Sequence, residues 1–213
     1  RVYGITYGIA VNVGYKFPIH NEETLQEFVA GYNQPPQTFF AMQAEGREWR
    51  DLIPDAMLPN FDYVFTDAMT WTNDAGKRMR LWIEDEVEVG DPQNFMDMLV
   101  NRIEKILTEP IDIYVNPTFL PAEIADRYDE LWTEDRMDRV INALLENDVA
   151  LEINERRQIP TAKIIKRAKA AGVKFTFGTN NTDSNLGHLR YCIDMIDECN
   201  LTGNDMWYPP QFR

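Results

Sequence analysis

Residues 133–154, TEDRMDRVINALLENDVALEIN, predict a helix followed directly by a buried strand. Thr133 is a typical N-cap residue, because its hydroxyl can accept a hydrogen bond from the first turn of a helix. The apolar residues after it recur at the i, i+3, i+4 spacing of a helix with one buried face, and they are Met137, Val140, Ile141, Leu144 and Leu145. The run VALEI at 149–153 is a short, nearly continuous apolar segment, as expected for a strand covered on both faces.

The same alternation extends in both directions along the chain. Six strands are predicted from apolar runs at 7–11, 38–44, 61–66, 111–115, 149–153 and 173–177. Helical patterns separate them, with start signals at Asn21, Asp91-Pro92, Thr133 and Pro160, a short helix at 47–53 and a last helix at about 185–199. Gly172 is expected to close the helix that Pro160 opens, in the left-handed conformation.

One irregular segment interrupts this alternation after the third strand. Residues 69–90 contain the turn signal NDAG at 73–76 between Trp71 and the run 78–83. This pattern predicts a hairpin-like insertion at one end of the fold.

Strict alternation of apolar strands with helices predicts a parallel sheet, either closed as a barrel or open and doubly wound. The first strand is not followed by a glycine-rich phosphate-binding turn, which disfavours a dinucleotide-binding sheet. We therefore expect residues 1–213 to form a single β/α barrel domain. Six strands are fewer than the usual eight, and one strand upstream of Arg1 would bring the number to seven.

Composition excludes several classes of partner. The chain has 35 acidic and 21 basic side chains, a formal charge of −14 that repels nucleic acid at long range. Because no stretch approaches 18 uncharged apolar residues, we expect no membrane-spanning segment. Cys192 and Cys199 lie two turns apart in a predicted helix, too far apart for a disulfide between them. We expect a cytoplasmic protein with a small-molecule substrate, and whether it forms a homo-oligomer stays open.

Polar side chains stand where each predicted strand ends. In a parallel sheet the active site lies at the carboxyl ends of the strands. The residues there are Asn12, Gln43, Glu45, Thr66, Asp67, Asn116, Glu152, Asn154, Thr179, Asn180 and Asn181. One such residue alone is often a turn or strand-end cap. Because all six strand ends converge on one rim, we expect a polar pocket there.

Three carboxylates at this rim, those of Glu45, Asp67 and Glu152, would repel one another unless a cation, a proton or an arginine lies among them. Three arginines follow two of these carboxylates in the sequence, and they are Arg47, Arg156 and Arg157. They are candidates either for the counter-charge or for the recognition of an anionic substrate. The residues by themselves leave these alternatives open.

The segments FDYVFTDA (61–68), IDIYVNPTFLP (111–121), VALEIN (149–154) and AKAAGVKFTFGTNNTDSNLGHLRYCIDMI (168–196) resemble the PHP superfamily, named for polymerase and histidinol phosphatase. The resemblance covers essentially the whole chain in the same strand order. It implies an α/β fold of the distorted (β/α)7 TIM-like barrel type, whose first strand lies upstream of this chain. It also implies hydrolysis of phosphoesters with a cluster of metal ions.

Most of the family's metal-ligand positions are substituted in this sequence. The opening His-x-His of the family, on its first strand, falls upstream of Arg1, and Glu45 matches the acid of the family's third strand. The other positions read Asn12-Val13, Met69, Asn116 before Pro117, and Asn180-Asn181-Thr182. The only histidines, His20 and His188, do not form a pair at metal-ligand spacing.

Two functional hypotheses follow. In the first, the protein is a metal-dependent hydrolase in which Glu45 and Asp67, with upstream histidines, hold zinc, manganese or iron. The catalytic residues would then be Glu45, Asp67 and Glu152, with Asp67 or Glu152 as general base. Substrate-binding roles fall to Asn12, Arg47, Asn116, Asn154, Arg156, Asn180 and Asn181.

In the second hypothesis, the barrel has lost its metals and is a binding protein or pseudoenzyme. Asparagine in place of aspartate or histidine keeps the shape of a ligand position and removes its charge. Such a site would hold a neutral polar ligand, such as a sugar, through hydrogen bonds.

Overall fold

The computed structural model describes residues 5–181 and 187–209, which form a mixed α/β fold. Its strands are β1 (Tyr7–Val13), β2 (Thr38–Ala44), β3 (Tyr63–Thr66), β4 (Thr70–Thr72), β5 (Arg78–Arg80), β6 (Ile113–Tyr114), β7 (Ala150–Asn154) and β8 (Phe175–Gly178). Its α-helices are α1 (Glu22–Gly31), α2 (Trp49–Leu52), α3 (Pro92–Ile106), α4 (Tyr128–Leu131), α5 (Glu134–Glu146), α6 (Ala162–Ala171) and α7 (Arg190–Glu198). Short 3₁₀ turns occupy Asp55–Asn60, Glu84–Glu86, Ala122–Arg127 and Gly203–Asp205.

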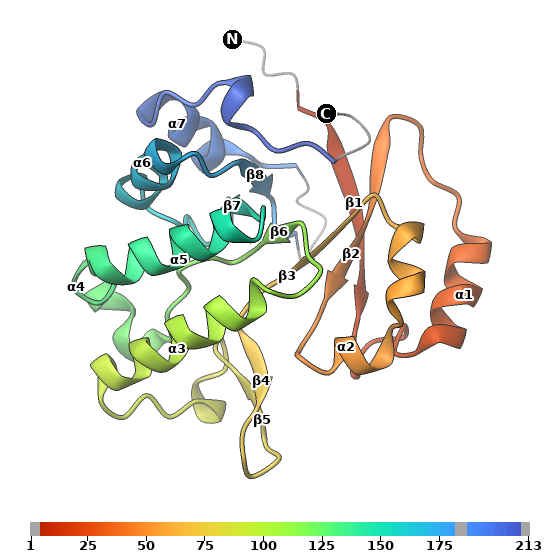
Figure 1. The fold of residues 1–213 in the computed structure, drawn as a ribbon, viewed down its shortest axis with the longest axis horizontal. Coiled ribbons are helices and arrows are strands. Elements are labelled where there is room, and N and C mark those ends of the chain that lie inside the picture. Colours follow the sequence, from red (N-terminus) through yellow and green to blue (C-terminus); the bar gives the residue numbers. More distant parts are fainter. Residues whose placement is uncertain (1–4, 182–186, 210–213) are drawn as a thin grey trace.

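Six strands form one sheet in the order β1-β2-β3-β6-β7-β8, and every neighbouring pair is parallel. Figure 1 shows this sheet curled, with α3, α5, α6 and α7 on one side of the molecule and α1 and α2 beside β1 and β2. Within the described residues no strand joins β8 back to β1, so the sheet is a half-barrel with two edges. The predicted parallel sheet of six strands with flanking helices is confirmed.

Alternate residues of each strand face opposite sides of the sheet, and the two sides differ in how they are covered. On the outer side, Phe40 and Met42 of β2 and Val64 of β3 belong to the main core with the helices. On the inner side lies a separate, much smaller apolar cluster of Ile113, Val115, Ala150 and Trp207, with Tyr63 and Phe65 packed against it. The main core therefore lies between the sheet and its helices.

Local signals in the sequence set most helix ends correctly. The side chains of Asn21, Asp91 and Thr133 cap α1, α3 and α5 by accepting hydrogen bonds from backbone N–H groups of the first turns. Helix α6 begins two residues after Pro160, at Ala162, because Thr161 still has extended backbone angles. Helix α7 begins at Arg190, and the start predicted at 185 lies outside the described residues.

The insertion at 69–90 contains the predicted hairpin. Strands β4 and β5 pair antiparallel, with Trp71 opposite Met79, and the pair projects from the fold (Figure 1). Among the described residues, no helix is both long and apolar enough to cross a membrane.

Gly172 has φ = +100° at the end of α6, and nothing lies within 4 Å of the position that a Cβ would take there. Gly172→Ala would therefore cause no steric clash, but it would place an alanine in the left-handed backbone conformation. We expect this strain to lower the free energy of unfolding by about 1 kcal/mol. Gly31, the last residue of α1, is equally open but helical, so Gly31→Ala should leave stability unchanged or raise it slightly. Urea denaturation of both variants measures this difference, and equal effects would contradict the assignment of Gly172 as a left-handed cap.

Candidate functional site

The carboxyl ends of four neighbouring strands bring five predicted site residues together. They are Asp67 after β3, Asn116 after β6, Glu152 and Asn154 in β7, and Asn180 after β8. Hydrogen bonds connect all five, and we call this set the amide network. It lies where a parallel sheet places ligand sites.

Asn116 is the centre of the amide network. Its backbone N–H donates to Glu152 Oε2 at 2.6 Å, and its Nδ2 donates to Asp67 Oδ2 at 2.9 Å. Its Oδ1 accepts hydrogen bonds from the Nδ2 atoms of Asn154 and Asn180, at 3.1 and 3.2 Å. Asn116 has φ = +47°, a left-handed conformation that asparagine tolerates better than most residues. One residue thus links strand ends contributed by β3, β7 and β8.

Asn154 is completely buried and has its polar atoms engaged within the protein. Its Nδ2 donates to Glu152 Oε2 at 2.9 Å as well as to Asn116, and its Oδ1 accepts from the backbone N–H of Arg157 at 2.9 Å. In this arrangement Asn154 positions the carboxyl group of Glu152.

The carboxyl group of Glu152 is buried against the backbone of β8. A Cβ at Gly178 would lie 1.6 Å from Glu152 Oε1, so the close approach requires glycine at that position. Burial raises the pKa of Glu152 to about 7, although the hydrogen bonds from Asn154 and Asn116 oppose the rise. Near neutral pH this carboxyl is therefore present in both its neutral and its ionised form.

The other two carboxyls of the predicted site are also perturbed. Burial raises the pKa of Asp67, against the hydrogen bonds that its Oδ1 accepts from Met69 N–H and its Oδ2 accepts from Asn116. Burial and the charge of Asp67 raise the pKa of Glu45 to about 7. Glu45 Oε1 accepts a hydrogen bond from Gln43 Nε2 at 3.0 Å. The hydrogen-bond donors stabilise the carboxylates, and the raised pKa values mean that the carboxyls bind protons more readily. Both effects reduce the repulsion that three ionised carboxylates would produce.

These residues do not fit a resident metal cluster. Within residues 5–181 and 187–209, no group of three or more His, Cys, Asp or Glu side chains is placed to hold an ion. Side-chain amides donate hydrogen bonds to Asp67 Oδ2 and to Glu152 Oε2. A structural or catalytic metal site normally needs three or four such ligands.

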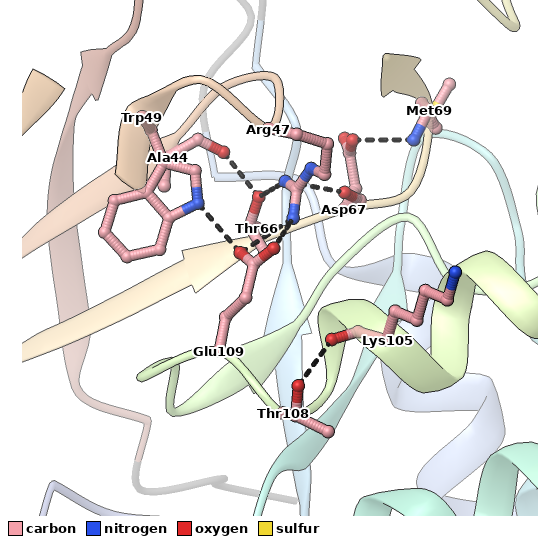
Figure 2. Close-up of polar contacts among 9 residues, drawn as sticks. All are labelled: Ala44, Arg47, Trp49, Thr66, Asp67, Met69, Lys105, Thr108 and Glu109. Carbon is pink, nitrogen blue, oxygen red and sulfur yellow. Dashed lines mark hydrogen bonds and ion pairs between the residues drawn. The ribbon is translucent and has the colours of Figure 1, made fainter. Parts of the chain in front are cut away.

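Arg47 is held by groups of the protein itself (Figure 2). Its Nη1 donates to both carboxylate oxygens of Glu109 at 2.7 Å, and its Nη2 donates to Thr66 Oγ1 at 2.7 Å. Glu109 also accepts a hydrogen bond from the indole Nε1 of Trp49 at 2.8 Å. The sequence reading did not single out Glu109, which lies 62 residues from Arg47 and follows no predicted strand. This pair ties the loop after β2 to the turn that follows α3.

A cavity of about 900 Å³ opens beside the amide network on the inner side of the half-barrel. Its polar lining at the carboxyl ends consists of Asn12, Gln43, Asn116, Glu152, Thr176, Thr179, Asn180 and Asn181. No lysine, arginine or histidine lines it among the residues that the structure describes, and Glu152 is the one carboxylate in its wall. Thus Asn12, Asn180 and Asn181 face the cavity as expected, whereas Arg47 and Arg156 are not part of its wall.

The inner aromatic residues of β2 and β3 also line this cavity, although the sequence reading assigned them no role. Their inward direction could have been inferred from the two-residue alternation of the strands.

No family model matches the sequence, and a search of curated proteins finds no match either.

Glu109→Ala should destabilise the protein strongly, because it removes three hydrogen bonds and leaves the guanidinium of Arg47 poorly compensated. Hydrogen bonds to charged groups contribute about 1.5–3 kcal/mol each, so we expect a loss of at least about 2 kcal/mol of unfolding free energy. The matched control is Glu130→Ala, which breaks the exposed pair with Arg127 and should cost less than about 1 kcal/mol. Equal losses in denaturant titrations would show that Glu109 is not a structural anchor.

Glu152 also gives stability a defined pH dependence. Its pKa is about 7 in the folded protein and near 4.5 in an unfolded chain, so the folded state binds the proton more tightly. Its contribution to the unfolding free energy is therefore fully present below about pH 4.5 and is lost as the pH rises through 7.

Glu152→Gln removes this titration while keeping the shape of the neutral carboxyl. The unfolding free energy of the wild type minus that of Glu152→Gln should fall by on the order of 3 kcal/mol between pH 4.5 and 8. Urea titrations across this range measure the difference, and a difference independent of pH would contradict a raised pKa at Glu152.

Proposed function

We propose that this protein binds a small, uncharged polar ligand, such as a sugar, without a metal ion. The observation that carries the proposal is the chemistry of the cavity wall, where, among the residues that the structure describes, amides and hydroxyls surround the carboxyl of Glu152. Side-chain amides both donate and accept hydrogen bonds, which matches the paired donor and acceptor character of sugar hydroxyls.

The charge of the wall argues against a phosphoester ligand. A phosphate group carries up to two negative charges and is normally met by arginine, lysine, a metal ion or a helix N-terminus. Arg47, the arginine next to the predicted carboxylates, already donates from Nη1 to both carboxylate oxygens of Glu109. An ionised Glu152 would in addition repel a bound anion.

Glu152 supports the binding of a neutral ligand in either protonation state. Because its pKa lies at about 7, the carboxyl accepts a hydrogen bond from a ligand hydroxyl when ionised and can donate one when protonated. Asn116 and Asn154 fix its orientation, so its position is established before a ligand arrives. Pre-organisation of this kind lowers the entropic cost of binding.

The metal-dependent hydrolase of the first hypothesis stays a prediction of the PHP resemblance. The (β/α)7 barrel likewise stays a prediction of that resemblance. The parallel order of the six strands is compatible with such a barrel. No step through a metal ion is assigned to the described residues, because their donor set does not fit one.

Isothermal titration with a panel of neutral mono- and disaccharides tests the proposal. We expect at least one member to bind in the presence of a chelator, and the corresponding sugar phosphate to bind at least tenfold more weakly. Asn180→Ala should weaken binding of that sugar about tenfold, in line with the loss of a partly buried hydrogen-bonding group. Asn94→Ala, on an exposed turn of α3, is the matched control and should bind like the wild type.

Two results would contradict the proposal. One is binding of phosphoesters but of no neutral sugar. The other is a stoichiometric amount of zinc, manganese or iron in the purified protein that Glu45→Gln removes, which would support the hydrolase.

A further inference from the structure

We propose that the ligand carries an apolar, ring-sized group next to its uncharged polar part, so that its class is that of a glycoside with an apolar aglycone. This inference rests on the proposed function and extends it. The polar part would lie against the amide network, and the apolar group would occupy an aromatic compartment of the same cavity. We define this compartment by Phe39, Tyr63, Phe65 and Trp207.

The cavity wall changes character along the strands. In β2 the inward residues run from Phe39 to Gln43, and in β1 they run from Gly8 and Ala10 to Asn12. In β6 and the residues after it, Ile113 and Val115 precede Asn116. The amino-terminal halves of β1, β2 and β6 therefore offer a largely apolar surface next to the polar rim.

On its β1 side the compartment is bounded by very small inward side chains, and at Gly8 the room that this leaves is taken by the ring of Tyr63. Gly8 and Ala10 occupy positions that bulky branched residues usually fill in a closed barrel. The ring of Tyr63 extends over Gly8, where a Cβ would lie 1.8 Å from the tyrosine hydroxyl oxygen. The inner apolar cluster is also separate from the main core.

The rings of the compartment are arranged around Tyr63. Its centroid lies 5.5 Å from that of Trp207 and 6.5 Å from that of Phe39, both in edge-to-face orientation, and 6.1 Å from that of Phe65. Such packing is the geometry that aromatic groups prefer, and a further ring extends it favourably. Burial raises the pKa of Tyr63 to about 12, so its hydroxyl stays uncharged and the compartment carries no charge at physiological pH.

The volume of the cavity favours a ligand larger than a single sugar. Sites of roughly 300–1,000 Å³ hold ligands of drug size, and this cavity of about 900 Å³ lies near the upper end. A monosaccharide at the amide network would leave the aromatic compartment in contact with water. A ligand that also covers the aromatic rings gains about 25 cal/mol for each Å² of apolar surface removed from water.

The test compares each sugar of the panel with its phenyl β-glycoside by isothermal titration. We expect at least one phenyl glycoside to bind tenfold or more tightly than its parent sugar. Ala10→Trp, which fills the compartment from an exposed position of β1, should abolish this gain and leave the affinity for the parent sugar unchanged. Ala75→Trp, the same substitution at an exposed turn between β4 and β5, should keep the gain.

Phe39→Ala provides a second variant that removes a ring instead of adding one, and it should reduce the gain at least threefold. Equal affinities for sugar and glycoside, or a full gain in Ala10→Trp, would overturn the inference and leave the proposed function intact. If no sugar binds in either form, or if phenyl phosphate binds as tightly as the phenyl glycoside, the proposed function itself fails.

Discussion

The arrangement of the site depends on one constraint, the placement of Asn116 between two buried carboxyl groups. Its backbone N–H and its side-chain amide donate to Glu152 and Asp67, which lie on different strands. Its side-chain carbonyl oxygen accepts hydrogen bonds from the side-chain amides of Asn154 and Asn180. Because an amide donates and accepts at the same time, it joins these groups without adding charge. A charged residue in its place would either repel the carboxylates or attract an anion into the cavity.

The second constraint is the pairing of Arg47 with groups outside the described cavity wall. Arg47 follows Glu45 in the sequence and is an obvious candidate for recognising an anion. In the structure its guanidinium donates hydrogen bonds to Glu109 and Thr66 (Figure 2). The carboxylate of Glu109 also accepts a hydrogen bond from the indole of Trp49. This ion pair connects the loop after β2 to the turn that follows α3. Among the described residues, the inner face of the half-barrel presents amides, hydroxyls, aromatic rings and the carboxyl of Glu152, which is the chemistry from which we propose a neutral ligand.

Much of this architecture could be predicted from local sequence signals. The alternation of apolar runs and helical patterns predicted the parallel sheet, and capping residues such as Thr133 predicted where helices begin. The convergence of Asp67, Asn116 and Glu152 followed from the rule that parallel strands end at one rim. The partner of Arg47 could not be predicted, because a contact across 62 residues depends on tertiary packing. The open aromatic compartment was missed for a similar reason, since it requires knowing that β1 places Gly8 and Ala10 on the inner face.

The most direct measurement of the central claim is a titration of the side-chain amide signals of the protein by ¹⁵N nuclear magnetic resonance. If the amide network recognises an uncharged polar ligand, the Nδ2 signals of Asn116 and Asn180 should shift when a neutral sugar binds. They should not shift when phosphate, a phosphoester or zinc is added at the same concentration. Shifts at these amides caused by a phosphoester or by the metal, with none caused by any neutral sugar, would contradict the account.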